Sequence, residues 1–118
     1  MLGLEFATGK LNLYDLGKTK LYAGGMPKER LIFKDWTYYG IQTISYSRIY
    51  EAMGADTQID AVVRVPADFS VKRGEYVILE DGDQYRVEIV RPIVVASYVR
   101  ALELTLIRLE DRYDVATD

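Results

Sequence analysis

The reactive side chains that this sequence lacks limit its chemistry more than those it has. Its 118 residues include no cysteine and no histidine. Ser-His-Asp and Cys-His catalysis are therefore excluded, and so are thiolate nucleophiles and most structural zinc sites. Paired carboxylates or a lysine remain as possible catalytic groups. We expect the protein not to be an enzyme and to need no cofactor and no metal.

Three acidic residues surround one predicted turn and are the first candidates for a cation site. Glu80, Asp81 and Asp83 flank Gly82. A calcium loop needs further oxygen ligands in register and a distal glutamate, and neither follows here. We interpret the group as the solvated tip of a β-hairpin.

A second pair of carboxylates, Glu88 and Glu103, falls in two predicted strands. Two acids on paired strands could act as general acid and base. Three basic residues, Arg86, Arg100 and Arg108, lie in the same two strands. Cross-strand ion pairs are therefore the better interpretation.

Tyrosine dominates the aromatic residues, with ten tyrosines against three phenylalanines and one tryptophan. Tyrosine combines a large apolar body with a polar tip, which suits protein interfaces. It is also a good strand former on half-exposed faces. The composition favours neither interpretation over the other.

The charge of the chain argues against binding to the phosphate backbone of nucleic acids. The net charge is −3, with six basic and four acidic residues in 1–36 and nine basic and fourteen acidic ones afterwards. A phosphate-binding protein would show a dense basic face. No apolar run reaches the roughly 20 residues of a membrane-spanning helix, and the first residues do not resemble a secretory signal. We expect a soluble protein of a cytosol-like compartment without a membrane partner.

Alternating apolar residues and turn signals predict an all-β fold. The predicted strands are 10–16, 20–23, 36–50, 57–66, 75–79, 84–90 and 98–109, with a turn at 17–19 and a bulge at Gly40. Asp81-Gly82 is a strong hairpin signal because glycine adopts a positive φ at little cost. The last four strands are predicted to form an antiparallel meander in which neighbours pair. We therefore expect a single domain over 1–118, a small antiparallel β-barrel of about six strands.

Three segments are predicted to lie outside the regular strands. Residues 24–35 contain Gly24-Gly25 and Pro27, which predict an exposed loop or arm, and Leu31, Ile32 and Phe33 form a candidate docking arm within it. Residues 47–56 are predicted to be a long loop or a short helix. Residues 110–118 are acidic and predicted to be a flexible tail.

Several stretches of the sequence carry a family resemblance that covers about residues 36–109. The aromatic strand begins at Trp36, and the other stretches are Tyr46–Ala52, Ile59–Pro66, Val71–Ile78, Gly82–Val87 and Ala101–Ile107. In this order they resemble the head–tail joining proteins of long-tailed bacteriophages, also called head-closure or stopper proteins.

The resemblance implies a structural virion protein that assembles into a homo-oligomeric ring. Such a ring docks beneath the portal and its adaptor, closes the channel after DNA packaging and receives the tail. It implies a place in the neck of the virion, assembly in the cytoplasm of the bacterial host, and at most passive contact with packaged DNA. The loop after the aromatic strand would face the channel, with Tyr50, Glu51, Met53 and Asp56 as its candidate residues.

Two other functions stay open at this point. A tail-completion protein or another neck or tail subunit would have the same setting, because small β-barrels recur along phage tails. A bacterial β-barrel module that binds a small molecule or a peptide would belong to a different class.

Overall fold

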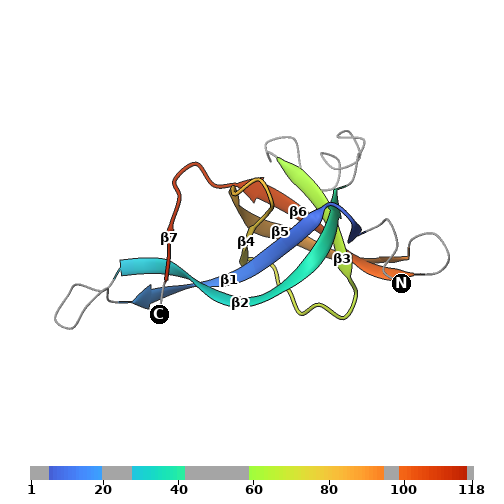
Figure 1. The fold of residues 1–118 in the computed structure, drawn as a ribbon, viewed down its shortest axis with the longest axis horizontal. Coiled ribbons are helices and arrows are strands. Elements are labelled where there is room, and N and C mark those ends of the chain that lie inside the picture. The colour runs from blue at the N-terminus through green and yellow to red at the C-terminus, as the bar shows by residue number, and fades with distance from the viewer. Residues whose placement is uncertain (1–5, 20–27, 42–58, 95–98, 117–118) are drawn as a thin grey trace.

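The computed structural model describes residues 6–19, 28–41, 59–94 and 99–116, which form an all-β fold without an α-helix in these ranges (Figure 1). The strands are β1 (Gly9–Thr19), β2 (Lys28–Ile41), β3 (Ala61–Pro66), β4 (Tyr76–Ile78), β5 (Gln84–Val94), β6 (Arg100–Arg108) and β7 (Asp114–Val115). The all-β prediction is confirmed.

Six of the strands close into a ring. Their order is β1-β4-β5-β6-β3-β2, and β2 pairs with β1 to complete the circle. Each neighbouring pair in the ring is antiparallel, whereas the short β7 is added to β2 in parallel. The ring agrees with the predicted small antiparallel barrel of about six strands.

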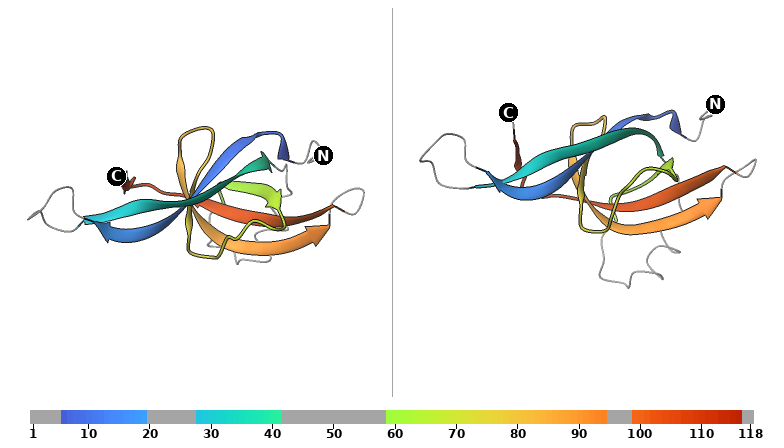
Figure 2. Two further views of the ribbon diagram at one scale, coloured as in Figure 1. Left: turned by 60° about the horizontal axis from the view of Figure 1, so that its bottom comes forward. Right: turned by 90° about the horizontal axis from the view of Figure 1, so that it is seen from below.

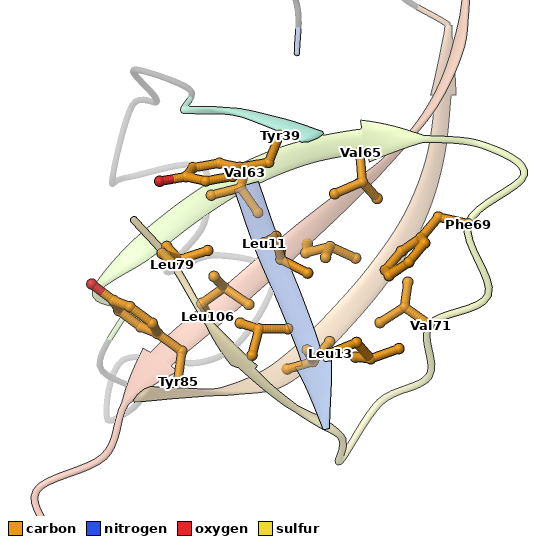
Figure 3. Close-up of a cluster of buried hydrophobic side chains, with 13 residues drawn as sticks. Leu11, Leu13, Tyr39, Val63, Val65, Phe69, Val71, Leu79, Tyr85 and Leu106 are labelled. Atoms are coloured by element: carbon orange, nitrogen blue, oxygen red, sulfur yellow. The ribbon is translucent and has the colours of Figure 1, made fainter. Parts of the chain in front are cut away.

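The ring encloses one hydrophobic core (Figure 3). Every ring strand contributes to it because alternate side chains of a strand point to the same face. Leu11 and Leu13 of β1 and Leu104 and Leu106 of β6 are fully buried. Burial of each such side chain contributes about 1.5–3 kcal/mol. The core cluster consists of Leu11, Leu13, Tyr39, Val63, Val65, Phe69, Val71, Val77, Leu79, Tyr85, Val87, Leu104 and Leu106.

The pairing of β3 differs from the predicted meander. β4 pairs with β5 and β5 pairs with β6 as expected, but β3 pairs with β6 along Ala61–Pro66 and not with β4. The connection over residues 67–75 explains the difference, because it places Phe69 and Val71 in the core. The chain therefore crosses the ring between β3 and β4 and does not turn back on itself.

The expected turn at 17–19 and the expected loop over 28–35 are both wrong. β1 continues through Gly17 and Lys18 to Thr19, and β2 begins at Lys28, so that Gly17 lies opposite Arg30. A Cβ atom at Gly17 would lie 2.5 Å from Cδ1 of Ile32, the end of a flexible and partly exposed side chain. Residues 20–27, which include the predicted strand 20–23 and the Gly24-Gly25 break, lie outside the described residues.

The bulges of the sheet also differ from the prediction. Gly40 is in regular register with Arg64. The irregularities instead lie at Lys34, where Leu13 and Tyr14 face Asp35 and Phe33, and at Glu88, between Val87 and Ile89. An extra residue in one strand bends that strand and increases its twist, which helps long strands to curve around a ring.

Two further predictions concern the turn at 80–83 and the C-terminus. The hairpin between β4 and β5 is confirmed, with Gly82 at a φ of 81° and its N–H bonded to the Leu79 carbonyl at 2.9 Å. The predicted flexible tail is wrong for residues 114–115, which form β7. Residues 47–56 and the end of the predicted aromatic strand, 42–50, lie outside the described part of the chain.

Part of the β1–β2 hairpin extends beyond the ring (Figures 1 and 2). β4 covers β1 only over Asn12–Tyr14, and the β1–β2 pairing continues to Thr19 and Lys28. The principal extents of the molecule are 54 × 37 × 21 Å and its radius of gyration is 15.5 Å. A compact domain of this length would have a radius of about 13.5 Å. We call residues 15–19 and 28–33 the arm.

Candidate interaction site: the arm and the C-terminal segment

The arm exposes two of the three residues that were predicted to dock a partner. Ile32 is 37% exposed and Phe33 is 52% exposed, whereas Leu31 is completely buried. Neighbouring residues of a strand point to opposite faces, so Ile32 and Phe33 offer apolar surface on both faces of the arm. Leu31 is covered by the protein's own strands and offers no exposed surface for docking.

An edge-to-face aromatic pair supports the arm where it leaves the ring. Tyr14 lies opposite Phe33, and their ring centroids are 5.8 Å apart at an angle of 77°. Tyr14 is buried, and burial raises the pKa of its hydroxyl. Phe33 therefore has one face held by Tyr14 while half of its surface stays open to a partner.

An ion pair joins the bulge of β2 to the ring. Lys34 binds Glu75 and lies 3.7 Å from Asp15. Glu75 is buried and also accepts a hydrogen bond of 2.6 Å from the N–H of Lys72. The hydrogen bond to Glu75 raises the pKa of Lys34. The bulge thus places a charged side chain where it connects both strands of the hairpin to the segment before β4.

The C-terminal segment, residues 112–116, is anchored to the ring by Gln84. The Gln84 side-chain amide is almost completely buried. Its Nε2 donates to the Tyr113 carbonyl, and its Oε1 accepts from the Tyr113 N–H, both at 2.8 Å. The ring of Tyr113 also meets that of Tyr76 at 5.7 Å. Burial and the neighbouring Tyr113 raise the pKa of Tyr76.

Beyond Tyr113 the same segment reaches the arm. Asp114 and Val115 pair with Arg30 and Leu31, and the Ala116 N–H donates to the Leu31 carbonyl at 2.8 Å. Leu31 therefore lies between Leu16 on one side and the C-terminal segment on the other.

An exposed ion pair fastens the end of this contact. Lys28 Nζ lies 2.8 Å from Asp114 Oδ2, and both side chains are more than 60% exposed. The hydrogen bond from Lys28 lowers the pKa of Asp114. Solvent screens such a pair, so it orients the segment more than it stabilises it.

A separate aromatic group lies on the outer face of β1 and β2, on the part of these strands that belongs to the ring and not to the arm. Trp36 and Tyr38 are both more than 40% exposed, and their rings meet edge to face at 5.2 Å. Lys10 Nζ lies 4.5 Å from the centroid of the Trp36 ring. These residues show that at least two of the aromatic side chains serve the surface and not the core.

Asp81, at the centre of the β4–β5 turn, is engaged by neighbouring residues. Asp81 accepts hydrogen bonds from the Tyr85 hydroxyl and from the Asp83 N–H, both at 2.8 Å. Burial, and then the bond to Asp81, raise the pKa of Tyr85. In the ranges that the structure describes, no group of three or more acids is arranged to hold a metal ion.

Glu88 and Glu103 each pair with an arginine, in agreement with the preference for ion pairs over a carboxylate pair. Arg91 donates to Glu103 at 2.6 Å across β5 and β6, where the two residues face each other. Glu88 pairs with Arg86 of its own strand. The expected cross-strand ion pair is confirmed for Glu103, although its partner was not among the three predicted arginines.

One open hollow of about 600 Å³ lies beside β5 and β6. It is lined by Asp60, Arg86, Ile107, Arg108, Leu109 and Glu110. Arg86 is bound to Glu88, and Asp60 accepts a hydrogen bond of 2.7 Å from the Arg108 N–H. Arg86 and Asp60 are thus engaged by the protein itself.

The remaining predicted site residues fall outside this description. Tyr50, Glu51, Met53 and Asp56, the candidate channel loop, belong to residues that the structure does not describe. Among the residues it does describe, no helix is long and apolar enough to cross a membrane. The contact between Gln84 and Tyr113 was not predicted, because nothing in the sequence around a single glutamine indicates that its side-chain amide will be buried.

Comparison with known proteins supports the fold. No family model matches the chain, and no curated protein matches it. Among solved structures, the solution structure of protein SF1141 from Shigella flexneri 2a is similar, with a TM-score of 0.60 and 15% sequence identity. The match covers 93% of this chain and 99% of that one. At this identity the likeness concerns the architecture of the strands.

Proposed function

We propose that this protein is a structural subunit of a bacteriophage head–tail connector, where copies of it form a ring that closes the portal channel and receives the tail. The observation that carries the proposal is the projecting arm with exposed Ile32 and Phe33. It gives a small ring of strands a surface for protein contacts. The sequence resemblance over residues 36–109 supplies the phage setting.

The chemistry of the chain agrees with a structural role. It has no cysteine or histidine, and the acids Glu88 and Glu103 are each bound to an arginine. The candidate channel loop with Tyr50, Glu51, Met53 and Asp56 remains a prediction of the resemblance.

Loss of the gene in a phage that carries it tests the proposal. We expect lysates with filled heads that lack tails and lose their DNA, visible by electron microscopy. Full and stable heads beside free, misassembled tails would instead support the alternative of a tail-completion subunit. Normal infectious particles would contradict both functions and leave the binding module.

Point variants separate the role of the arm from stability of the fold. The double variant Ile32→Ser, Phe33→Ser removes exposed apolar surface, so we expect folded protein that fails to complement the deletion. Val94→Ser is the matched control, since Val94 is 64% exposed at the end of β5, outside the arm. Equal complementation by both variants would remove the arm from the proposed function.

A further inference from the structure

Residues 112–116 contact the rest of the protein without contributing a side chain to the core. The contacts are the two bonds between Gln84 and Tyr113, the Ala116–Leu31 bond, the Tyr76–Tyr113 ring contact and the exposed pair Lys28–Asp114. Arg112 adds a bond of 3.0 Å to the Gly82 carbonyl and lies 4.0 Å from the Asp83 carboxylate. The segment can therefore leave its site as a unit without disrupting the core.

The site that receives the segment requires this particular chemistry. If the segment left, the buried Gln84 amide would lose a donor and an acceptor, which is costly for a buried polar group. Leu31 would lose the strand beside it, next to the exposed Ile32 and Phe33. Any other segment bound there must offer a main-chain N–H and carbonyl to the Gln84 amide. It must also offer an acid to Lys28 and an N–H to the Leu31 carbonyl. Another copy of this chain carries all three at the correct spacing.

A short connection before the segment allows it to swing outward. The Leu109 N–H is bonded to the Gln84 carbonyl at 2.9 Å, which fixes the end of β6. Glu110 and Asp111 follow as exposed bends. In the described part of the chain their side chains form no ion pair, and as adjacent like charges they repel each other. The exchange proposed below requires these two residues to act as its hinge.

We propose that residues 112–116 exchange between neighbouring copies, so that each copy inserts its C-terminal segment between the Gln84 site and the arm of the next. Exchange of an identical element reproduces every bond of the closed form, which makes it an inexpensive way to associate. Each copy then has one donor segment and one acceptor site. Such head-to-tail contacts close into a ring when the rotation between neighbouring copies allows it. The inference therefore rests on the proposed ring and names the contact between its subunits.

Cross-linking through introduced cysteines tests the exchange, because the natural chain has no thiol. Lys28→Cys and Asp114→Cys place thiols on the two exposed partners of the ion pair, within reach of a short bismaleimide. A segment on a short linker has an effective concentration on the order of mM, so the purified full-length protein is treated over dilutions up to that range. We expect the double variant to yield covalent dimers and larger species at high concentration. We expect the mixed single variants to yield heterodimers that disappear on dilution.

A matched pair distinguishes exchange from random collision. Lys10 and Tyr38 lie opposite each other on β1 and β2 and are both exposed, so Lys10→Cys, Tyr38→Cys should close within one chain at every concentration. If Lys28→Cys, Asp114→Cys likewise gives only the intrachain product up to the mM range, the exchange is wrong. Cross-links between copies in a protein that proves dispensable for virions would instead refute the proposed function and leave the exchange standing.

Discussion

The side chain of Gln84 pairs with the main chain of Tyr113 as a strand would. Its amide donates to the carbonyl and accepts from the N–H of the same residue, both at 2.8 Å. One buried side chain thereby satisfies two main-chain groups of a segment that has left the ring. This pair directs the C-terminal segment towards the arm and couples the position of the arm to the ring.

Replacement of Gln84 tests this coupling. Gln84→Ala removes both hydrogen bonds and leaves the Tyr113 main chain without its partner, so we expect a loss of about 1–3 kcal/mol in the free energy of unfolding. Urea denaturation measures it. Arg73→Ala is the control, because its exposed side chain lies away from the C-terminal segment and should change stability by about 0.5 kcal/mol or less. Similar values for the two variants would show that the pair contributes little.

Substitution of Gly17 tests the close packing within the arm. Valine normally suits a strand, but at Gly17 its side chain would meet Cδ1 of Ile32, which lies 2.5 Å from the position of a Cβ atom. We expect Gly17→Val to lower the free energy of unfolding by roughly 0.5–1.5 kcal/mol, the cost of forcing the exposed Ile32 side chain out of its rotamer. Ile32→Ala should relieve most of this loss in the double variant, since it removes the obstacle. Strictly additive effects in a double-mutant cycle would contradict the contact.

Two leucines of β6 allow the effect of full burial on stability to be compared with that of partial burial. Leu104 is completely buried, whereas Leu102 is only partly buried against the same core. Leu104→Ala should cost about 2–5 kcal/mol because it leaves a cavity in a closed core. Leu102→Ala should cost clearly less in the same thermal or chemical denaturation. The reverse order would mean that the core is centred elsewhere.

The raised pKa of Tyr85 leads us to expect a loss in the free energy of unfolding in alkaline solution. Burial raises the pKa of its hydroxyl above the ordinary value of 10.0, and the hydrogen bond to Asp81 adds to the rise. The folded state therefore retains a proton that the unfolded state loses, so this contribution is complete below pH 10 and declines as the pH rises above it.

The variant Tyr85→Phe removes this titration. Its stability should decline less steeply above pH 10, by up to about 1.4 kcal/mol per pH unit, the value for one proton. Denaturant midpoints measured from neutral to alkaline pH give both slopes. Tyr38→Phe, which removes an exposed hydroxyl, controls for the loss of a tyrosine. Parallel curves for Tyr85→Phe and the natural protein would exclude the role of Tyr85.

Local sequence patterns were sufficient for most of the strands and for the class of fold. Leu11 and Leu13, like Leu104 and Leu106, alternate with other residues, and a strand of period two must bury such positions on one side. The Asp81-Gly82 turn followed from the freedom of glycine at positive φ. The pairing of β4 with β5 and of β5 with β6 was predicted because these strands follow one another in the chain, and the structure confirms both pairings.

The features of the candidate site depend on residues far apart in the chain, and only the folded molecule reveals them. Gly17 was read as a turn because its need for space comes from Ile32 across the hairpin. Leu31 was read as exposed because the segment beside it arrives from the other end of the chain. Phe69 and Val71 direct β3 to β6 by entering a core that exists only once the ring closes. Local preference acts between neighbours, whereas packing and hydrogen-bond satisfaction act between whatever the closed ring brings together.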